Sequence, residues 1–208
     1  MKKAGAKSTP RKRRNGRNGA RLPQITQYAW RLRRDYLVLV AAVAAADANL
    51  DPRELALLAR WLDEFEIAPK SRQEVLAVAN HEPVNLLAIQ RRLAGTELAC
   101  SAVLDMMGMA MADGVLMDDE ILTLQGIAFG MNIEPLHFNI LIEFVHSAHQ
   151  AAQLKNPEPL YEHNIEAAFK LLRRLRVRLF THTLLCPSNP GYDQQLKDRW
   201  ARFSPARG

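Results

Sequence analysis

Apolar residues recur every third or fourth position along most of this chain, the spacing that places them on one face of an α-helix. No run of alternating β-branched residues interrupts this pattern. The sequence therefore predicts an all-α fold, a single bundle of about seven to nine helices. A first helix contains the apolar run from Leu37 to Ala46. The further predicted helices are residues 51–65, 69–79, 84–93, 96–112, 118–131, 134–150, 159–185 and 192–203.

Two stretches of the predicted bundle resemble each other. Residues 46–67 read ADANLDPRELALLARWLDEFEI, and residues 112–133 read ADGVLMDDEILTLQGIAFGMNI. Aligned without a gap, they share Asp47 with Asp113 and Glu54 with Glu120, and each follows a helix rich in small and apolar residues. The sequence thus predicts an internal repeat of helix, acidic turn and helix. We call residues 47–54 and 113–120 the acidic corners.

The aspartates of the acidic corners have two explanations. Asp47 and Asp113 stand at the C-terminal end of a predicted helix, where the helix dipole disfavours an anion by about 0.3–1 kcal/mol. Each carboxylate therefore needs a partner, either the N-terminus of the following helix or a cation. If a pseudo-twofold axis relates the copies, the four acids converge, and carboxylates about 4 Å apart repel by about 4 kcal/mol at an effective dielectric of 20. Such a cluster needs a cation or shifted pKa values.

The glutamates of the corners are explained by helix capping in the first copy and less well in the second. The segment Asp51-Pro52-Arg53-Glu54 has the order of an N-cap, a proline at the first helical position and a capping-box glutamate. The second copy has Met117 in place of Asp51, which is a poor N-cap. An EF-hand is excluded, because its loop would carry Pro52 where glycine is required and Leu58 where the bidentate glutamate belongs.

The paired corners ADANLDPREL and ADGVLMDDEI resemble the acidic signature of the tellurite-resistance TerB-like superfamily, over roughly residues 36–150. The resemblance implies a helical bundle with an acidic surface that binds a divalent cation, in a bacterial stress-response or membrane-associated system. By matching position, the metal-binding residues are Asp47, Glu54, Asp113 and Glu120. Their ligand atoms are hard oxygens, which suit Ca²⁺, Mg²⁺ or Mn²⁺.

Charge is strongly segregated along the chain, although the net charge is only +6. Residues 1–39 hold 12 Lys/Arg and one acid, whereas residues 40–169 hold 7 Lys/Arg and 19 acids. Residues 170–208 are basic again, with 9 Lys/Arg and two acids. The sequence thus predicts an acidic core between two basic ends.

The first basic end, residues 1–21, has nine Lys/Arg, no acid and no Leu, Ile, Val or aromatic residue. It has no large aliphatic or aromatic cluster whose burial could offset the entropy cost of ordering the chain. We therefore expect a disordered tail. The candidate nucleic-acid or polyanion contacts are Arg11, Lys12, Arg13, Arg14 and Arg17. The tail lacks interleaved aromatic residues, so such binding would be independent of sequence. The alternative is a tail that only solubilises the protein or neutralises its acidic core.

The second basic end contains an amphipathic segment. Its cations alternate with leucine and valine, which favours an apolar face packed on the bundle and arginines paired with the acidic core. The alternative is a basic helix that lies on a membrane surface or on nucleic acid. The cations are Lys170, Arg173, Arg174, Arg176 and Arg178.

Three further patterns have ordinary structural explanations. Glu143, His146 and His149 follow one another at three-residue steps and predict a polar helix face, with a metal site as the alternative. The methionine-rich segment 106–111 predicts core packing, with a plastic partner groove as the alternative. Cys100 and Cys186 match no metal spacing and are too few for a disulfide framework, which indicates a reducing compartment.

These observations predict a bacterial, cytoplasmic and non-enzymatic protein. The longest apolar run has 10 residues, and about 20 are needed to span a membrane. No secretory signal and no catalytic motif is present. We expect a tail over residues 1–21, a TerB-like domain over 22–155 and basic helices over 156–208. The predicted function is binding of a divalent cation or a protein partner through the acidic corners. The alternatives are a nucleic-acid-associated protein that uses the tail and a membrane-surface adaptor that uses both basic ends.

Overall fold

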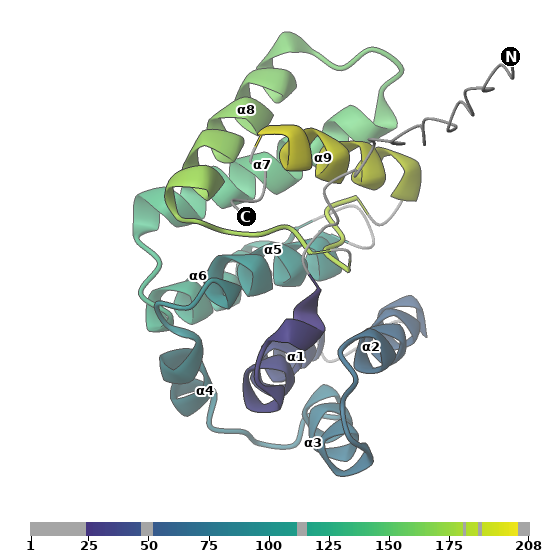
Figure 1. The fold of residues 1–208 in the computed structure, drawn as a ribbon, viewed down its shortest axis with the longest axis vertical. Helices are drawn as coiled ribbons and strands as arrows, with labels where there is room; N and C mark the ends of the chain where they lie inside the picture. Colours follow the sequence, from purple (N-terminus) through teal and green to yellow (C-terminus); the bar gives the residue numbers. More distant parts are fainter. Residues whose placement is uncertain (1–23, 47–51, 112–115, 181, 187–188, 204–208) are drawn as a thin grey trace, which may run out of the picture.

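The computed structural model describes residues 24–46, 52–111, 116–180, 182–186 and 189–203. Within these ranges the chain is helical and contains no strand, which confirms the predicted all-α class (Figure 1). A short 3₁₀ helix, η1 (Ile25–Gln27), precedes the α-helices. The helices are α1 (Trp30–Ala44), α2 (Pro52–Glu64), α3 (Pro69–Ala79), α4 (Leu86–Leu93), α5 (Leu98–Ala110), α6 (Asp118–Gly130), α7 (Pro135–Gln153), α8 (Pro159–Arg174) and α9 (Pro190–Phe203).

Helices α1 and α5 form the centre of the bundle. Every residue of α5 is buried, and so is α1 from Asp35 to Ala44 except for Ala42. A helix that is apolar on all sides can be stable in water only when other elements cover all of it. Helices α2, α3 and α4 pack on α1, and helices α6 and α7 pack on α5. The segment 106–111 is buried within α5 and the residue after it, so the prediction that its methionines pack in the core is confirmed.

The internal repeat is present in three dimensions and is longer than the two 22-residue stretches. Helices α1, α2 and α3 correspond to α5, α6 and α7, because the four helix boundaries at the two turns of each copy differ by the same 66 positions. The third helix of each copy begins with a proline, whose fixed φ suits the first helical position. The matching boundaries are Ala44 and Ala110, Pro52 and Asp118, Glu64 and Gly130, and Pro69 and Pro135.

The helix ends of the two copies also have the same geometry. Glu66 follows α2 with φ 51°, and Asn132 follows α6 with φ 62°. The next residues, Ile67 and Ile133, donate their backbone N–H to a carbonyl in the last turn of the helix at 3.1 and 3.0 Å. This is a Schellman motif, in which a left-handed residue ends the helix and an apolar residue returns to the core.

The predicted helix over residues 159–185 is wrong beyond Arg174. Arg176 adopts φ 55°, and Val177 donates its backbone N–H to the carbonyl of Leu172 at 2.9 Å, which ends α8 in another Schellman motif. The chain then leaves the helix and enters the core, where Val177 and Phe180 are buried. Apolar spacing alone does not distinguish a buried helix from a buried extended segment.

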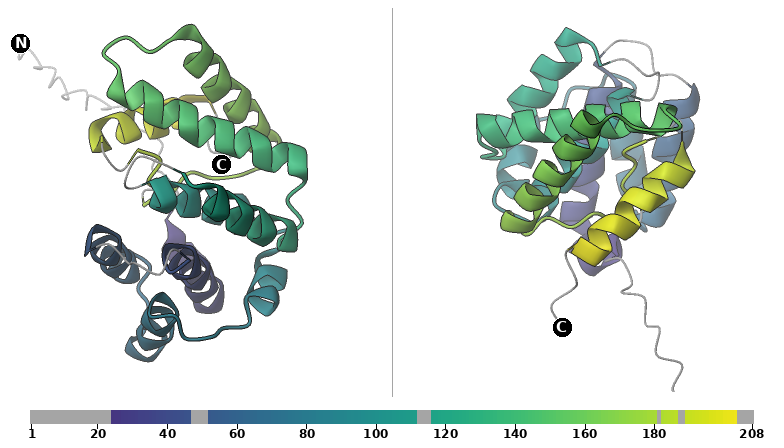
Figure 2. Two further views of the ribbon diagram at one scale, coloured as in Figure 1. Left: turned by 180° about the vertical axis from the view of Figure 1, so that it is seen from behind. Right: turned by 90° about the horizontal axis from the view of Figure 1, so that it is seen from above.

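The C-terminal helices cover the end of the bundle that α7 forms (Figure 2). Helix α8 packs along α7, and its Asn164 amide donates to the Ser147 hydroxyl at 3.0 Å. Helix α9 packs on α8 through three aromatic rings: the centroid of Phe169 lies 5.5 Å from that of Trp200 and 5.7 Å from that of Phe203. The apolar face of α8 is therefore inside the protein, as predicted.

None of the described helices is long and apolar enough to cross a membrane.

Candidate functional site

The structure describes half of the predicted cation site. Asp47 and Asp113 lie outside the described residues, as do the tail residues Arg11, Lys12, Arg13, Arg14 and Arg17. The two glutamates are described: Glu54 lies in the first turn of α2, and Glu120 lies in the first turn of α6. The convergence of the four carboxylates thus stays a prediction.

Glu120 has a capping role that the sequence reasoning assigned only to the first copy. Its Oε2 atom accepts the backbone N–H of Met117 at 2.7 Å, which is the glutamate half of a capping box. Met117 supplies no side-chain cap in return, because a thioether is a poor acceptor. The expectation that capping explains the second corner poorly is therefore wrong for Glu120.

The neighbouring acids of the second corner face solvent. Asp118 and Asp119 are exposed in the first turn of α6, where the helix dipole favours negative charge. Together with the half-buried Glu120, they make the start of α6 the most acidic helix start in the described chain. A cation at this corner would therefore meet a negative field.

No group of three potential metal ligands comes together among the described residues. Glu143, His146 and His149 of α7 do not form such a group. Glu143 and His146 are exposed, and His149 is buried. Three-residue steps turn by 60° each around an α-helix, so the outer members of the series point 120° apart. The polar face that the sequence predicted here is limited to Glu143 and His146.

A buried polar cluster, which the sequence reasoning missed, joins α1, α5 and the segment after α8. The Tyr36 hydroxyl donates to Asp105 Oδ2, and the Leu184 backbone N–H donates to Asp105 Oδ1 at 3.2 Å. The imidazole Nε2 of His182 lies 3.2 Å from Asp105 Oδ2. Burial, followed by the charge of Asp105, raises the pKa of Tyr36 well above its ordinary value. The tyrosine is therefore a hydrogen-bond donor at neutral pH.

Four aromatic rings surround His182. Phe180 stacks on the imidazole with a centroid distance of 5.2 Å, and the Phe65 ring lies 4.5 Å away at a steep angle. Tyr36 and Trp61 contribute ring edges at 5.8 and 6.2 Å. His182 is thus held between the Asp105 carboxylate and a wall of aromatic rings, in a position that packing strongly restricts.

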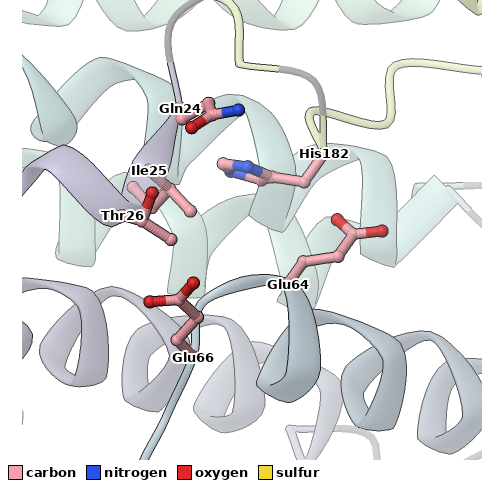
Figure 3. Close-up of a pocket in the computed structure, with 6 residues that line it drawn as sticks. All are labelled: Gln24, Ile25, Thr26, Glu64, Glu66 and His182. Atoms are coloured by element: carbon pink, nitrogen blue, oxygen red, sulfur yellow. The ribbon is translucent and has the colours of Figure 1, made fainter.

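The cluster borders a small hollow, which we call the His182 hollow (Figure 3). It has a volume of about 280 Å³. The carboxylates of Glu64 and Glu66 lie on one side and the His182 ring on another, and Glu64 is 3.4 Å from Arg60. The hollow is lined by Gln24, Ile25, Thr26, Glu64, Glu66 and His182.

One sequence signal points to this cluster. Asp105 is the only charged residue between Glu97 and Asp113. The other residues of this segment are small or apolar, as expected for a helix in the core. A buried aspartate is rare unless it is paired. Its partners, Tyr36 and His182, come from distant parts of the chain, so the sequence identifies the need for partners but not the partners themselves.

Two other buried aspartates have clear structural roles. Asp35 accepts hydrogen bonds from Arg92 at 2.6 and 3.2 Å, which ties α1 to α4. This bond is the main reason why the pKa of Arg92 is raised. Asp193 accepts the Leu185 backbone N–H at 2.7 Å and lies 2.5 Å from the Lys197 ammonium. These contacts anchor helices rather than form a reactive site.

The basic segment 170–178, which spans the end of α8 and the residues after it, behaves only partly as predicted. Arg178 pairs with Glu97 of the core at 3.2 Å. The remaining four cations, Lys170, Arg173, Arg174 and Arg176, are exposed, and within the described part of the chain none of them has a carboxylate partner. The expectation of arginines paired with the acidic core therefore holds for one residue of the segment.

One comparison with known proteins gives a match. A family model described as "Tellurite resistance protein TerB" matches residues 33–141, from α1 to the first part of α7. The match includes both acidic corners and all of α5. No curated protein and no solved structure matched the chain.

Proposed function

Because the chain belongs to the tellurite-resistance TerB family, we propose that it is a non-enzymatic domain that binds a divalent cation through its two acidic corners. The sequence offers no nucleophile, phosphate loop or metal-catalysis motif that would argue for an enzyme. A cation held between the corners would also supply a charged surface for a protein partner. We place the protein in the bacterial cytoplasm in a stress-response or accessory role, which the family description and the two free cysteines support.

The observation that carries this proposal is the repetition of the acidic corners at an offset of 66 residues, with Asp47 matched to Asp113 and Glu54 to Glu120. The helix before each corner ends, and the helix after it begins and ends, at positions 66 residues apart, so Asp47 and Asp113 are equivalent in sequence between equivalent helices. If a pseudo-twofold axis brings the two pairs of carboxylates together, they are a reasonable donor set for one hard cation.

The donor set also limits which cation to expect. The four residues, Asp47, Glu54, Asp113 and Glu120, contribute oxygen atoms only, and neither histidine nor cysteine occurs within the corners. Oxygen donors suit Ca²⁺, Mg²⁺ or Mn²⁺ and give little advantage to Zn²⁺ or Cu²⁺. Glu120 accepts the Met117 N–H through Oε2, and an ionised carboxylate has acceptor capacity beyond one hydrogen bond.

Thermal unfolding of the full chain tests the proposal. A cation that binds only the folded state stabilises it by about 2.7 kcal/mol at a hundredfold excess over its dissociation constant. For a domain of this size we expect millimolar Ca²⁺, Mg²⁺ or Mn²⁺ to raise the Tm by about 5–10 °C. The double variant Asp113→Asn/Glu120→Gln should lose this rise. Glutamine keeps the acceptor for the Met117 N–H, so the change removes charge and not the cap.

The matched control is Asp118→Asn/Asp119→Asn, which removes the same charge from exposed positions of the same helix turn. It should keep most of the cation-dependent rise. In the absence of cations, Asp113→Asn/Glu120→Gln should be no less stable than the wild type, because repulsion is relieved. The proposal is rejected if cations leave the wild-type Tm unchanged and the double variant is less stable than the wild type. The corners would then act only as helix caps.

A further inference from the structure

The arginines without a carboxylate partner gather at one end of the molecule. Seven of the arginines whose side chains are described pair with a carboxylate. Six do not, and four of these lie at the C-terminal ends of α8 and α9. The four are Arg173, Arg174, Arg176 and Arg202, and the other two are Arg31 and Arg91. Lys170 adds a further unpaired cation beside the four.

Three of these cations surround a hollow between the two helices, which we call the α8–α9 hollow. It is lined by Lys170, Arg173, Arg174 and Phe203 and has a volume of about 370 Å³. Lys170 and Arg174 lie one helical turn apart, so they are neighbours on one face of α8. The Arg173 guanidinium lies 5.9 Å from the centre of the Phe203 ring, a distance typical of a cation–π contact.

The floor of the α8–α9 hollow is fixed by packing. Phe203 stacks on Trp200 with a centroid distance of 6.0 Å and contacts Phe169 of α8 at 5.7 Å. Trp200 is buried, and Phe169 lies in the core. The cations thus extend from a rigid aromatic base, which lowers the entropy cost of holding them around an anionic ligand.

We infer that the α8–α9 hollow binds the phosphodiester backbone of a nucleic acid, independently of base sequence. Guanidinium groups match phosphate oxygens with paired N–H donors, and arginine is the common choice for phosphate recognition. Lys170 and Arg174 are separated by about 6 Å along the helix axis, which spans about two phosphates of a strand with a 3.4 Å rise. The α8–α9 hollow lies outside residues 33–141, so this site is an addition to the family domain.

The packing of α8 argues against a membrane surface as the ligand. A helix that lies on a membrane inserts its apolar face, but the apolar face of α8, including Ile165 and Leu172, is buried in the bundle. Leu160 is 60% exposed, yet it stands at the opposite end of α8, about 15–20 Å from the cations. Apart from the half-buried Phe203, no large apolar side chain lines the α8–α9 hollow.

The salt dependence of binding measures the contribution of the α8–α9 hollow. Each phosphate contact contributes about −0.9 to the slope of log K against log salt for duplex DNA. Three contacts would therefore weaken binding about 40-fold between 50 and 200 mM salt. The tail contributes its own slope, but that contribution is the same in all variants that keep the tail.

The experiment compares two triple variants of the full chain on a 20-base-pair DNA duplex of arbitrary sequence. Lys170→Gln/Arg173→Gln/Arg174→Gln removes the three cations of the α8–α9 hollow. Arg31→Gln/Lys70→Gln/Arg91→Gln removes three exposed cations that likewise have no carboxylate partner among the residues the structure describes. Both variants change the net charge by the same amount, so any difference between them reports position. EDTA in the buffer keeps divalent cations away from the acidic corners and separates this test from the cation proposal.

We expect the first variant to reduce the salt slope by about 2 to 3 and to weaken binding at 50 mM salt by at least about tenfold. The second variant should keep the wild-type slope. All six residues are exposed, so the Tm of both variants should match the wild type. Equal losses in the two variants would assign the effect to net charge, and no loss in either would assign it to the tail. Either result overturns the inference. The inference is also overturned if Lys170→Gln/Arg173→Gln/Arg174→Gln loses binding to phosphatidylglycerol vesicles while its binding to DNA stays the same as that of the wild type.

Discussion

The imidazole of His182 and the carboxylate of Asp105 meet in the centre of the protein, with 3.2 Å between Nε2 and Oδ2. Asp105 belongs to the family-matched part of the chain, and His182 lies beyond it. The segment after α8 is therefore built into the core of the TerB-like bundle. Its stability and that of the bundle should be inseparable.

Loss of the Asp105 carboxylate should strongly destabilise the protein. Asp105→Ala would leave the buried Tyr36 hydroxyl and the half-buried Leu184 N–H without this acceptor, and a buried group left unsatisfied costs about 1–3 kcal/mol. We expect the free energy of unfolding to fall by at least about 3 kcal/mol, measured by urea denaturation.

Tyr36→Phe is the matched comparison for Asp105→Ala. It removes one hydrogen bond but leaves Asp105 bonded to the Leu184 N–H, so the expected loss is about 1 kcal/mol. If Asp105→Ala were no worse than Tyr36→Phe, the carboxylate would not organise this cluster.

Two glycines should respond to alanine in opposite directions. A Cβ atom at Gly108 of α5 would overlap the carbonyl oxygen of Leu184, whereas a Cβ atom at Gly126 of α6 would meet nothing within 4 Å. Gly108→Ala should force the segment after α8 away from α5 and destabilise the protein by about 3 kcal/mol. Gly126→Ala should stabilise it by up to about 1 kcal/mol, because alanine is the better helix former. The Tm measured by circular dichroism should fall for Gly108→Ala and rise for Gly126→Ala. An unchanged Tm for Gly108→Ala would contradict the close packing of α5 on Leu184.

His81 should be better replaced by glycine than by alanine. His81 follows α3 with φ 64°, a left-handed conformation that costs an L-residue about 1–2 kcal/mol and glycine nothing. The variant His81→Gly should therefore raise the free energy of unfolding by about 0.5–1 kcal/mol. His81→Ala keeps the strain and should bring no gain. Equal stabilities of the two variants in urea would contradict the assigned helix end.

Both cysteine thiols should be unreactive in the folded protein. Burial raises the pKa of Cys100 to about 11, and burial together with Asp193 raises that of Cys186 to about 12. At pH 8 about one Cys100 thiol in a thousand is ionised. We expect Ellman's reagent to label the native protein very slowly at pH 8 and to label two thiols per chain in guanidinium chloride. Rapid labelling of one native thiol would contradict its burial.

The same pKa shifts set the sign of an alkaline effect. A thiol whose pKa is higher in the folded state favours folding while it is neutral, so this contribution is complete below the unfolded pKa near 9. It should be lost as the pH rises from about 9 toward 11 or 12. The variant Cys100→Ala should show a smaller loss of stability over this range than the wild type.

Most of the helices could be predicted from the sequence, because the apolar spacing of a helix is a local property. The repeat of residues 46–67 and 112–133 predicted the matched ends of α2 and α6. Residues 175–180 and 182–185 were misassigned as helix, because most of their apolar residues are buried and show no spacing specific to a strand or a coil. The capping bond of Glu120 was missed, because the N-cap residue, Met117, takes part through its backbone and not through its side chain.

The sequence by itself determined the all-α class, the internal repeat, the segregation of charge and the family, since each of these depends on residues close together in the chain. Tertiary structure decided which buried groups meet. Tyr36, Asp105 and His182 come together because α1, α5 and the segment after α8 pack in the same core. Tertiary structure also decided that Arg178 pairs with Glu97, whereas Arg173 and Arg174 pair with no carboxylate in the described part of the chain. The physical reason is that a hydrogen bond or an ion pair depends on distances of a few ångströms, which packing sets and local sequence does not.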